Sequence, residues 1–199
     1  EAKIALQDLK SVYIDLNDIN AYASYVNSIG GNIRLEVGEQ DSLTYIAAEK
    51  LFMRGDNDGA RRSLINYLQT FPEGAFSSNA NFYLGSIAFA KKEFDEAIQR
   101  FKSVIASGDT KFLEESVART AEIEYLSKDY PAALESFKRL QIVAENPENR
   151  QAARLGIMRC ALQTGQQKDA LLAADELLKE PKLSPELEAE ARYVRAKAY

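Results

Sequence analysis

Few residues of this chain have side chains and spacings suited to chemistry. Histidine, the commonest general base and metal ligand, is absent. No Gly-rich phosphate loop, Cys/His metal spacing or nucleophile with a neighbouring base is present. The acid pairs Glu114–Glu115 and Glu188 with Glu190 lie in amphipathic patterns, where carboxylates are most often solvated. We therefore expect no catalytic residue, cofactor or metal, and no enzymatic activity.

The single cysteine and the charge balance narrow the class of protein further. Cys160 has no partner for an internal disulfide, and its position suits a small buried apolar residue. Lys plus Arg number 25 against 30 Asp plus Glu, a net charge of -5, so no basic field exists to bind nucleic acid. No run approaches the roughly 18 apolar residues of a membrane-spanning helix, so this fragment should not insert into a membrane. Glu1 to Ile4 suggest an amphipathic helix, so we expect either a cytosolic chain or a leader outside this sequence.

An internal repeat organises the chain. Alanines recur with separations of 37, 36 and 37 residues, at Ala60, Ala97, Ala133 and Ala170. Apolar residues stand four positions after each alanine, and mostly small residues stand twelve before, namely Ala48, Gly85, Ala121 and Met158. Within a unit the apolar residues follow helical spacing. The pattern predicts two helices per unit, crossing at the small residues.

Capping residues indicate where the helices start and turn. Asn146-Pro147-Glu148 and Ser184-Pro185-Glu186 each place a capping side chain before a proline at the first helical position. Gly55 and Gly165 suit the tight turns between paired helices. The remaining first helices are predicted to start at Asp41 or Ser42, Ser77 or Ser78, and Asp109 or Thr110.

These columns resemble the tetratricopeptide repeat (TPR) family, most clearly where Leu84-Gly85, Phe94, Ala97 and Phe101 fall on family positions. Tyr130, Ala133 and Phe137 repeat the pattern in the next unit. The resemblance implies an all-α fold, a right-handed α-α superhelix (solenoid) of antiparallel helix pairs with about 11 helices. The passage from Tyr67 to Phe101 looks like TPR proteins of the Gram-negative cell envelope, of the outer-membrane-assembly lipoprotein and Tol-Pal coordinator types. That likeness favours a periplasmic location.

The predicted organisation is a degenerate helix pair with an extended connector in residues 1–40, followed by a TPR array in residues 41–199. The units of the array are approximately 41–76, 77–113, 114–150 and 151–184, with a first helix of a further unit at 185–199. Residues 33–37 alternate in polarity, which suggests a short extended connector or an irregular loop. Two features depart from the family: Met158 is not small, and family position 11, usually tyrosine, is Glu124 in one unit. Tyr125 next to it raises the alternative of a one-residue register shift.

The resemblance also implies where a ligand would bind. First helices of TPR proteins line the concave surface, and family positions 5, 9 and 12 commonly face the ligand. The residues selected in this way are Tyr45, Glu49, Phe52, Phe82, Phe89, Glu122, Tyr125, Leu155, Arg159 and Tyr193. Aromatic anchors contribute most to interface energetics. The alternative for each is packing against the next helix, or, for the charged ones, an ordinary solvated surface.

A known ligand class of the family fits poorly. Co-chaperone TPR domains hold a terminal carboxylate with Lys, Asn and Arg at set positions, where this chain has Tyr45, Glu49, Tyr83, Glu115 and Arg119. Only the arginine matches. The sequence thus favours a non-catalytic scaffold or adaptor that binds a protein or peptide within a larger cell-envelope protein. The alternatives are a structural segment that self-associates and a regulatory module of a larger enzyme.

Overall fold

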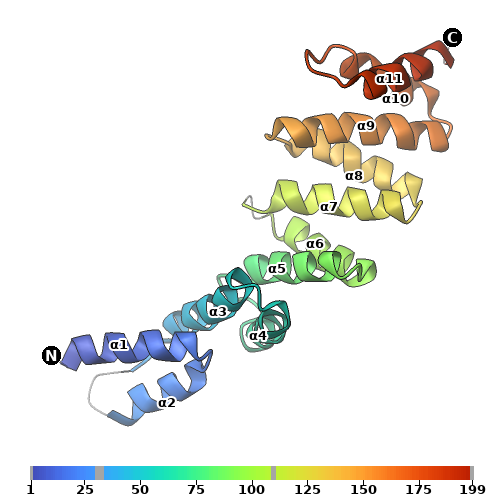
Figure 1. The fold of residues 1–199 in the computed structure, drawn as a ribbon. Helices are drawn as coiled ribbons and strands as arrows, with labels where there is room; N and C mark the ends of the chain where they lie inside the picture. Colours follow the sequence, from blue (N-terminus) through green and yellow to red (C-terminus); the bar gives the residue numbers. More distant parts are fainter. Residues whose placement is uncertain (1, 30–33, 109–110, 198–199) are drawn as a thin grey trace. The chain divides into compact units, whose positions relative to one another are not determined.

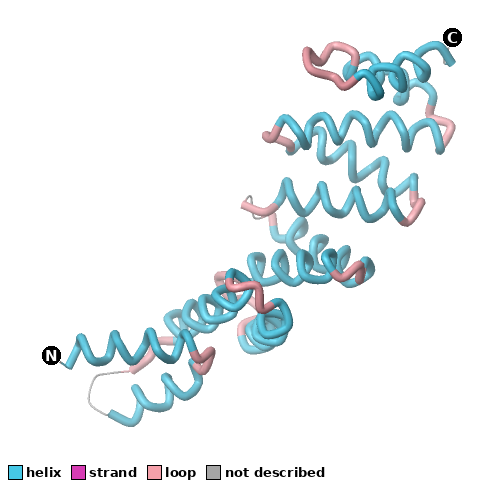
Figure 2. Tube along the Cα trace, in the orientation of Figure 1, coloured by secondary structure: helices cyan, strands magenta, loops and turns pink. Residues whose placement is uncertain are grey.

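The structure is a computed structural model that describes residues 2–29, 34–108 and 111–197, and these residues form eleven α-helices and no β-strand. Figures 1 and 2 show the helices in chain order. In chain order the helices are α1 (Ala2–Asp15), α2 (Ile19–Ile29), α3 (Val37–Met53), α4 (Asn57–Thr70), α5 (Ser77–Ala90), α6 (Phe94–Ser107), α7 (Leu113–Leu126), α8 (Tyr130–Val143), α9 (Pro147–Gln163), α10 (Gln167–Leu177) and α11 (Pro185–Lys197).

The chain divides into two compact units. Residues 1–93 contain α1 to α5, and residues 94–199 contain α6 to α11. In the second unit α7, α8, α9 and α10 stack in chain order, each against the next, and α7 also contacts α9. No helix of the described residues combines the length and apolar character needed to cross a bilayer.

The repeat columns form the core of both units. Ala60, Ala97, Ala133 and Ala170 are at most 1% exposed. The small-residue column twelve positions earlier is buried as well, including Met158, which occupies its site at 0% exposure. An alanine at a helix crossing lets two backbones approach closely, so the apolar faces meet without voids. The prediction that these columns are the contact points between paired helices is therefore supported by their burial.

The tight turn after each first helix is built around one left-handed residue. Gly55 and Gly165 have φ of 82° and 73°, which confirms the predicted glycine turns. Lys92 and Lys128 take the same place after α5 and α7, with φ of 61° and 62°. Side chains other than glycine rarely adopt this conformation. The residue types at positions 92 and 128 therefore do not indicate these two turns.

Helix starts were predicted with mixed success. Helices α5, α9 and α11 begin at Ser77, Pro147 and Pro185, as expected. Helix α3 begins at Val37, four residues before the predicted Asp41, so that prediction was wrong. Residues 34–36 form a non-helical connection, while residue 33 and the predicted starts Asp109 and Thr110 lie outside the described residues. The extended segment predicted for residues 33–37 therefore overlaps α3 at its last residue, Val37.

The N-terminal pair α1 and α2 breaks at Asn17, which has φ of 56°. Asp18 accepts a hydrogen bond from the backbone N–H of Ala21 and so caps α2. Tyr22, which stands where the family has alanine, is buried at 5% exposure, and its ring lies 5.8 Å from that of Tyr13. A large aromatic therefore fills the contact that alanine makes in the other pairs.

The register of α7 needs no shift at Tyr125. Glu124 occupies the buried family position at 5% exposure and accepts hydrogen bonds from Ser136 Oγ at 2.6 Å, with Lys102 Nζ 3.2 Å away. A buried carboxylate is tolerated when it is paired and hydrogen-bonded in this way. The one-residue shift considered from the sequence is wrong, and Tyr125 is left to face the neighbouring helix α9.

Acidic residues at equivalent places in α3 and α7 hold the loop that precedes the next first helix. Asp41 and Glu114 stand seven residues before Ala48 and Ala121, respectively. Asp41 accepts hydrogen bonds from Tyr67 Oη and from the backbone N–H of Ala75. Asp41 therefore lies inside α3 and binds the loop before α5. It does not cap the start of α3, contrary to the prediction from the sequence.

Glu114 accepts hydrogen bonds from the backbone N–H groups of Glu145 and Asn146, at 2.9 and 3.1 Å, and from Asn149 Nδ2 at 2.7 Å. Burial acts to raise the pKa of Glu114, but the three hydrogen bonds together outweigh it and hold the pKa below its usual range. These contacts join α7 to the start of α9 and so set the spacing of two first helices.

We expect Glu114→Ala to lower the free energy of unfolding by about 1–2 kcal/mol at neutral pH, because hydrogen bonds to a charged group are lost at a partly exposed site. A carboxyl with a lowered folded pKa stabilises the fold above its unfolded pKa of about 4.3, and this stability is lost as the pH falls through the folded pKa. The difference between wild type and variant in urea unfolding should therefore shrink towards pH 3.

The matched control is Glu115→Ala, which removes the neighbouring carboxylate. Glu115 pairs with Arg119 on the same helix, and both side chains are about two-fifths exposed. Such a pair is worth about 0.3–0.5 kcal/mol. Equal losses for the two variants, or a loss for Glu114→Ala that does not change with pH, would contradict the role assigned to Glu114.

Candidate functional site

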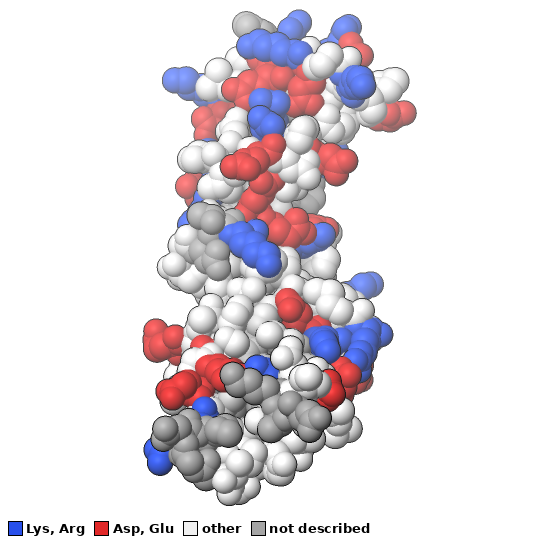
Figure 3. Space-filling view, turned by 90° about the vertical axis from the view of Figure 1, so that its left-hand side faces the viewer, with Lys and Arg blue, Asp and Glu red and all other residues white. Residues whose placement is uncertain are grey.

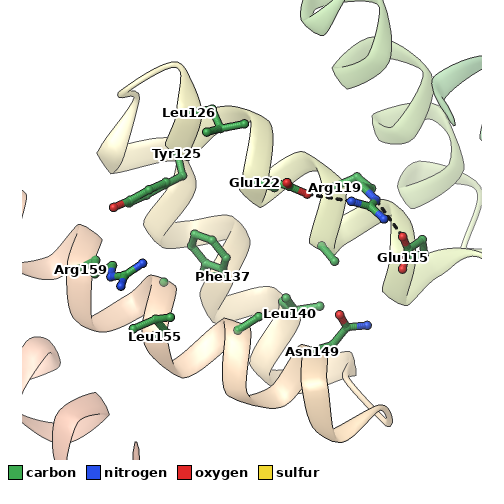
Figure 4. Close-up of a pocket in the computed structure, with 13 residues that line it drawn as sticks. Glu115, Arg119, Glu122, Tyr125, Leu126, Phe137, Leu140, Asn149, Leu155 and Arg159 are labelled. Carbon is green, nitrogen blue, oxygen red and sulfur yellow. Dashed lines mark hydrogen bonds and ion pairs between the residues drawn. The ribbon is translucent and has the colours of Figure 1, made fainter. Parts of the chain in front are cut away.

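The candidate binding site in the second unit is a groove between α7 and α9. Helix α8 supplies its floor, and the open volume is about 280 Å³ (Figure 4). Its lining, referred to below as the α7–α9 groove, consists of Glu115, Ala118, Arg119, Glu122, Tyr125, Leu126, Phe137, Leu140, Asn149, Ala152, Leu155, Gly156 and Arg159.

The floor is apolar and closely packed. Leu140 is fully buried, Phe137 is 8% exposed and Leu155 is half-buried. Gly156 of α9 lies against the Phe137 ring, since a Cβ at position 156 would come within 2.4–2.5 Å of three ring atoms. The Tyr125 and Phe137 rings meet edge-on, with centroids 6.4 Å apart. Glycine thus lets α9 approach α8, and the Phe137 ring lines the groove.

Each arginine on the rim forms ion pairs with glutamates. Arg119 donates to Glu115 at 2.8 Å and to Glu122 at 2.9 Å, one turn away on either side in α7 (Figure 4). Arg159 donates two hydrogen bonds of 2.8 Å to Glu190 of α11. Planar bidentate pairing of this kind is among the stronger ion-pair geometries.

The pKa of each partner in the α9–α11 pair shifts towards the charged form. The hydrogen bond to Glu190 raises the pKa of Arg159, against the opposing effect of burial. The same hydrogen bond lowers the pKa of Glu190. Both groups therefore stay ionised throughout the neutral range, and the pair fixes the guanidinium at the end of the groove that also holds Tyr125.

Four of the residues predicted from the sequence meet in this groove: Glu122, Tyr125, Leu155 and Arg159. Tyr193, on α11, is 63% exposed and does not line it. The residues that the sequence prediction missed include Phe137, Leu140 and Gly156. Phe137 was recognised as a core column, but nothing in the sequence showed that its ring also lines a groove.

The five predicted residues of the first unit lie on α3 and α5. Tyr45 is 2% exposed, stacks on Phe76 with ring centroids 4.4 Å apart, and donates to Glu49 Oε1 at 2.6 Å. Tyr83 also donates to Glu49. Burial, together with the hydrogen bond to Glu49, raises the pKa of Tyr45. The packing alternative therefore describes Tyr45 well, and Glu49 is a partly buried acceptor for two tyrosines.

Aromatic residues of α3 and α5 that remain half-buried are Phe52, Phe82 and Phe89. The Phe52 ring lies 4.6 Å from that of Tyr83, and the Phe82 ring lies 5.7 Å from it. Each retains some accessible surface, so these three remain predicted contacts, but the first unit shows no apolar pocket comparable with the α7–α9 groove among its described residues.

The structure brings no set of three or more His, Cys, Asp or Glu side chains into metal-binding geometry within the described residues. Cys160 is fully buried, and burial raises its pKa to about 11. A thiol in this setting is protonated at neutral pH and inaccessible, so Cys160 packs as a small apolar residue, as the sequence suggested.

Gly156→Ala should lower the free energy of unfolding by about 1–2 kcal/mol. Alanine gains up to about 1 kcal/mol of helix propensity over glycine, but the clash with the Phe137 ring is an overpacking defect of about 1–3 kcal/mol. Denaturant unfolding measures the change. Adding Phe137→Leu should then cost less than Phe137→Leu costs alone, because the smaller side chain relieves the clash. Additive effects of the two changes would show that the ring and the glycine are not in contact.

The geometry defines a helical-repeat protein whose helix pairs stack and leave a groove between first helices. Residues 47–110 match the family model of the tetratricopeptide repeat. The comparison with curated proteins found no significant match.

Solved structures share this fold. The crystal structure of MamA has 18% sequence identity and a TM-score of 0.59, covering 81% of this chain and 87% of MamA. MamA from AMB-1 has 15% identity and a TM-score of 0.61, covering 94% of this chain and 97% of the other. A kinesin-light-chain-type protein from Podosopora anserina with nearly identical TPR-like repeats has 15% identity and a TM-score of 0.51, covering 97% and 94%. At these identities the likeness concerns the fold alone. The all-α, TPR-like fold predicted from the sequence is confirmed.

Proposed function

We propose that this chain is a non-catalytic protein-interaction module that binds a segment of a partner protein in the α7–α9 groove. The observation that carries the proposal is an apolar floor between two first helices, formed by Phe137, Leu140 and the half-buried Leu155, with charged residues only at the rim. Concave apolar sites with a few polar groups are the usual form of ligand pockets.

The charge distribution agrees with a protein partner. On the face drawn in Figure 3, acidic and basic side chains are interspersed over each unit, and the net charge of the chain is -5. A nucleic acid would require a continuous basic surface. The proposal includes a location in the bacterial cell envelope, supported by the resemblance of residues 67–101 to envelope TPR proteins, and it assigns no reaction to the chain.

Site-specific crosslinking tests the proposal. A photoreactive amino acid at the exposed groove position Ala152 should crosslink a partner, whereas the same residue at Ala106, which is exposed on α6 outside the groove, should not give that product. Excess unlabelled partner should suppress the product at position 152. The same product and yield from both positions would place the partner elsewhere on the surface and refute the groove as the binding site.

Self-association is a second candidate, favoured by exposed apolar residues on α1 and in the turn that follows it. Ile4 and Val12 of α1 and Leu16 of the turn are 67%, 51% and 67% exposed. Exposed apolar residues that lie close together can form an interface. Light scattering that shows a mass rising with protein concentration, and a fixed monomer mass after Leu16→Glu, would support this candidate. A constant monomer mass for the wild type would reject it.

A further inference from the structure

The dimensions of the α7–α9 groove limit what can occupy it. Its volume of about 280 Å³ lies just below the range of about 300–1,000 Å³ that is typical of small-molecule pockets. A helix would need to place several anchors over two or more turns. Phe137, Leu140 and Leu155 provide one continuous apolar floor rather than a row of separate pockets. The space therefore suits one large side chain of an extended segment.

The charges around the groove disfavour an acidic anchor. The rim and its partner on α11 contribute three carboxylates, from Glu115, Glu122 and Glu190, and two guanidiniums, from Arg119 and Arg159, a sum of -1. Both arginines already donate to these carboxylates. A carboxylate entering the groove would have to displace an existing partner and would meet like charges, which costs free energy on both counts.

The lining also lacks the chemistry that would favour a lysine or arginine anchor. The glutamates that could receive a cation already accept from Arg119 or Arg159, and the floor beneath them offers only apolar groups. Burying a charged head against Phe137 and Leu140 would leave it without hydrogen bonds. An uncharged apolar side chain removes water from the floor without disturbing the rim pairs, so its burial is favourable.

We infer that the α7–α9 groove recognises a partner segment by one large apolar side chain, aromatic or branched aliphatic, and selects against acidic residues and against a free terminal carboxylate. The inference rests on the proposed function, because it specifies the chemistry of the partner at that same groove. Phe137 and Leu155 contact the anchor, while the Arg119 and Arg159 pairs border it and exclude charge.

A selection of random peptides displayed on phage tests the inference. Peptides are selected on the wild-type chain and then measured, as synthetic fluorescent peptides, against Ala152→Trp and against Ala106→Trp. Ala152→Trp fills the groove, and Ala106→Trp places the same side chain on an exposed part of α6. We expect peptides that share one large apolar residue, that bind Ala106→Trp normally and that lose at least about tenfold affinity for Ala152→Trp.

The peptide side supplies an independent measurement. Changing the shared apolar residue to Ala should cost at least about tenfold in affinity, changing it to Glu should cost more, and amidation of the peptide C-terminus should leave affinity unchanged. If Ala152→Trp does not fold, Ala118→Trp fills the opposite wall, and the peptide series on the wild-type chain still decides the matter.

The outcomes separate the two claims. Groove-dependent peptides that share acidic residues, or that need a free C-terminal carboxylate, would overturn the inferred anchor and leave the proposed binding groove standing. Peptides that bind Ala152→Trp and Ala118→Trp as well as the wild type would overturn the groove as a binding site. A selected segment that matches α1 of this chain would identify a second copy as the partner while keeping the apolar anchor.

Discussion

Asp41→Ala should lower the free energy of unfolding by about 3 kcal/mol, the largest single effect that we expect on the stability of the first unit. Asp41 is 8% exposed and Tyr67 is fully buried. Asp41 accepts from Tyr67 Oη and from the N–H of Ala75 at 2.9 Å, while Tyr67 Oη in turn accepts from the N–H of Phe76 at 3.0 Å. Removing the carboxylate leaves the buried Tyr67 hydroxyl without its acceptor, at about 1–3 kcal/mol, and also removes the hydrogen bond from the exposed Ala75, at about 0.5–1.5 kcal/mol. Urea unfolding followed by circular dichroism measures the loss.

Tyr67→Phe and the double variant complete the test. If the contact exists, the double variant should be less destabilised than the sum of the two single variants, by about 1 kcal/mol or more. The loop at Gly74 gives a separate check, since a Cβ there would lie 2.5 Å from Tyr67 Oη. Strictly additive losses would mean that Asp41 and Tyr67 act independently and that this network does not order the loop between α4 and α5.

Leu155→Glu should reduce binding of a groove-selected peptide by about tenfold to a hundredfold. Leu155 is half-buried in the wall of the groove, and a carboxylate there would face an apolar floor and the acidic rim. Truncating or charging a central contact typically costs about 2 kcal/mol or more. Fluorescence anisotropy with a labelled peptide gives the dissociation constant, and a thermal melt shows that the variant is folded.

Leu172→Glu is the matched control for this experiment. Leu172 lies on α10, is 55% exposed and does not line the groove, so the same change of charge should leave the affinity within about twofold of the wild type. Equal losses in the two variants would indicate a general electrostatic effect on the peptide, and unchanged binding of Leu155→Glu would remove that residue from the site.

The fold could be predicted from the sequence because each repeat buries the same columns. Ala133 and Ala121 are small where two helices cross, and that constraint recurs in every unit, so it is visible as a period. Features that depend on contacts between repeats were not visible. Asp41 looked like a helix cap, yet its partners, Tyr67 and Ala75, are 26 and 34 residues away. Lys92 and Lys128 adopt a left-handed conformation that no local preference indicates.

The residues of the candidate site were likewise predicted only in part. The resemblance to TPR proteins selected Tyr125, Leu155 and Arg159 because first-helix positions recur in a known orientation, and these residues meet in one groove. It also selected Tyr45, which is buried. Whether an aromatic side chain at a given position packs or remains accessible depends on the size of its neighbours, such as Phe76 beside Tyr45 or Gly156 beside Phe137, and only the structure shows those pairs.

The measurement that tests the central claim most directly is a methyl NMR titration of the leucine- and isoleucine-labelled chain with a groove-selected peptide. Binding of an apolar anchor between α7 and α9 predicts concentration-dependent shifts at Leu126, Leu140 and Leu155, with ring-current shifts if the anchor is aromatic. The methyls of Ile142 and Leu172, which are exposed outside the groove, should not move. Shifts confined to Ile142 and Leu172, with Leu140 and Leu155 unchanged at saturation, would contradict the account.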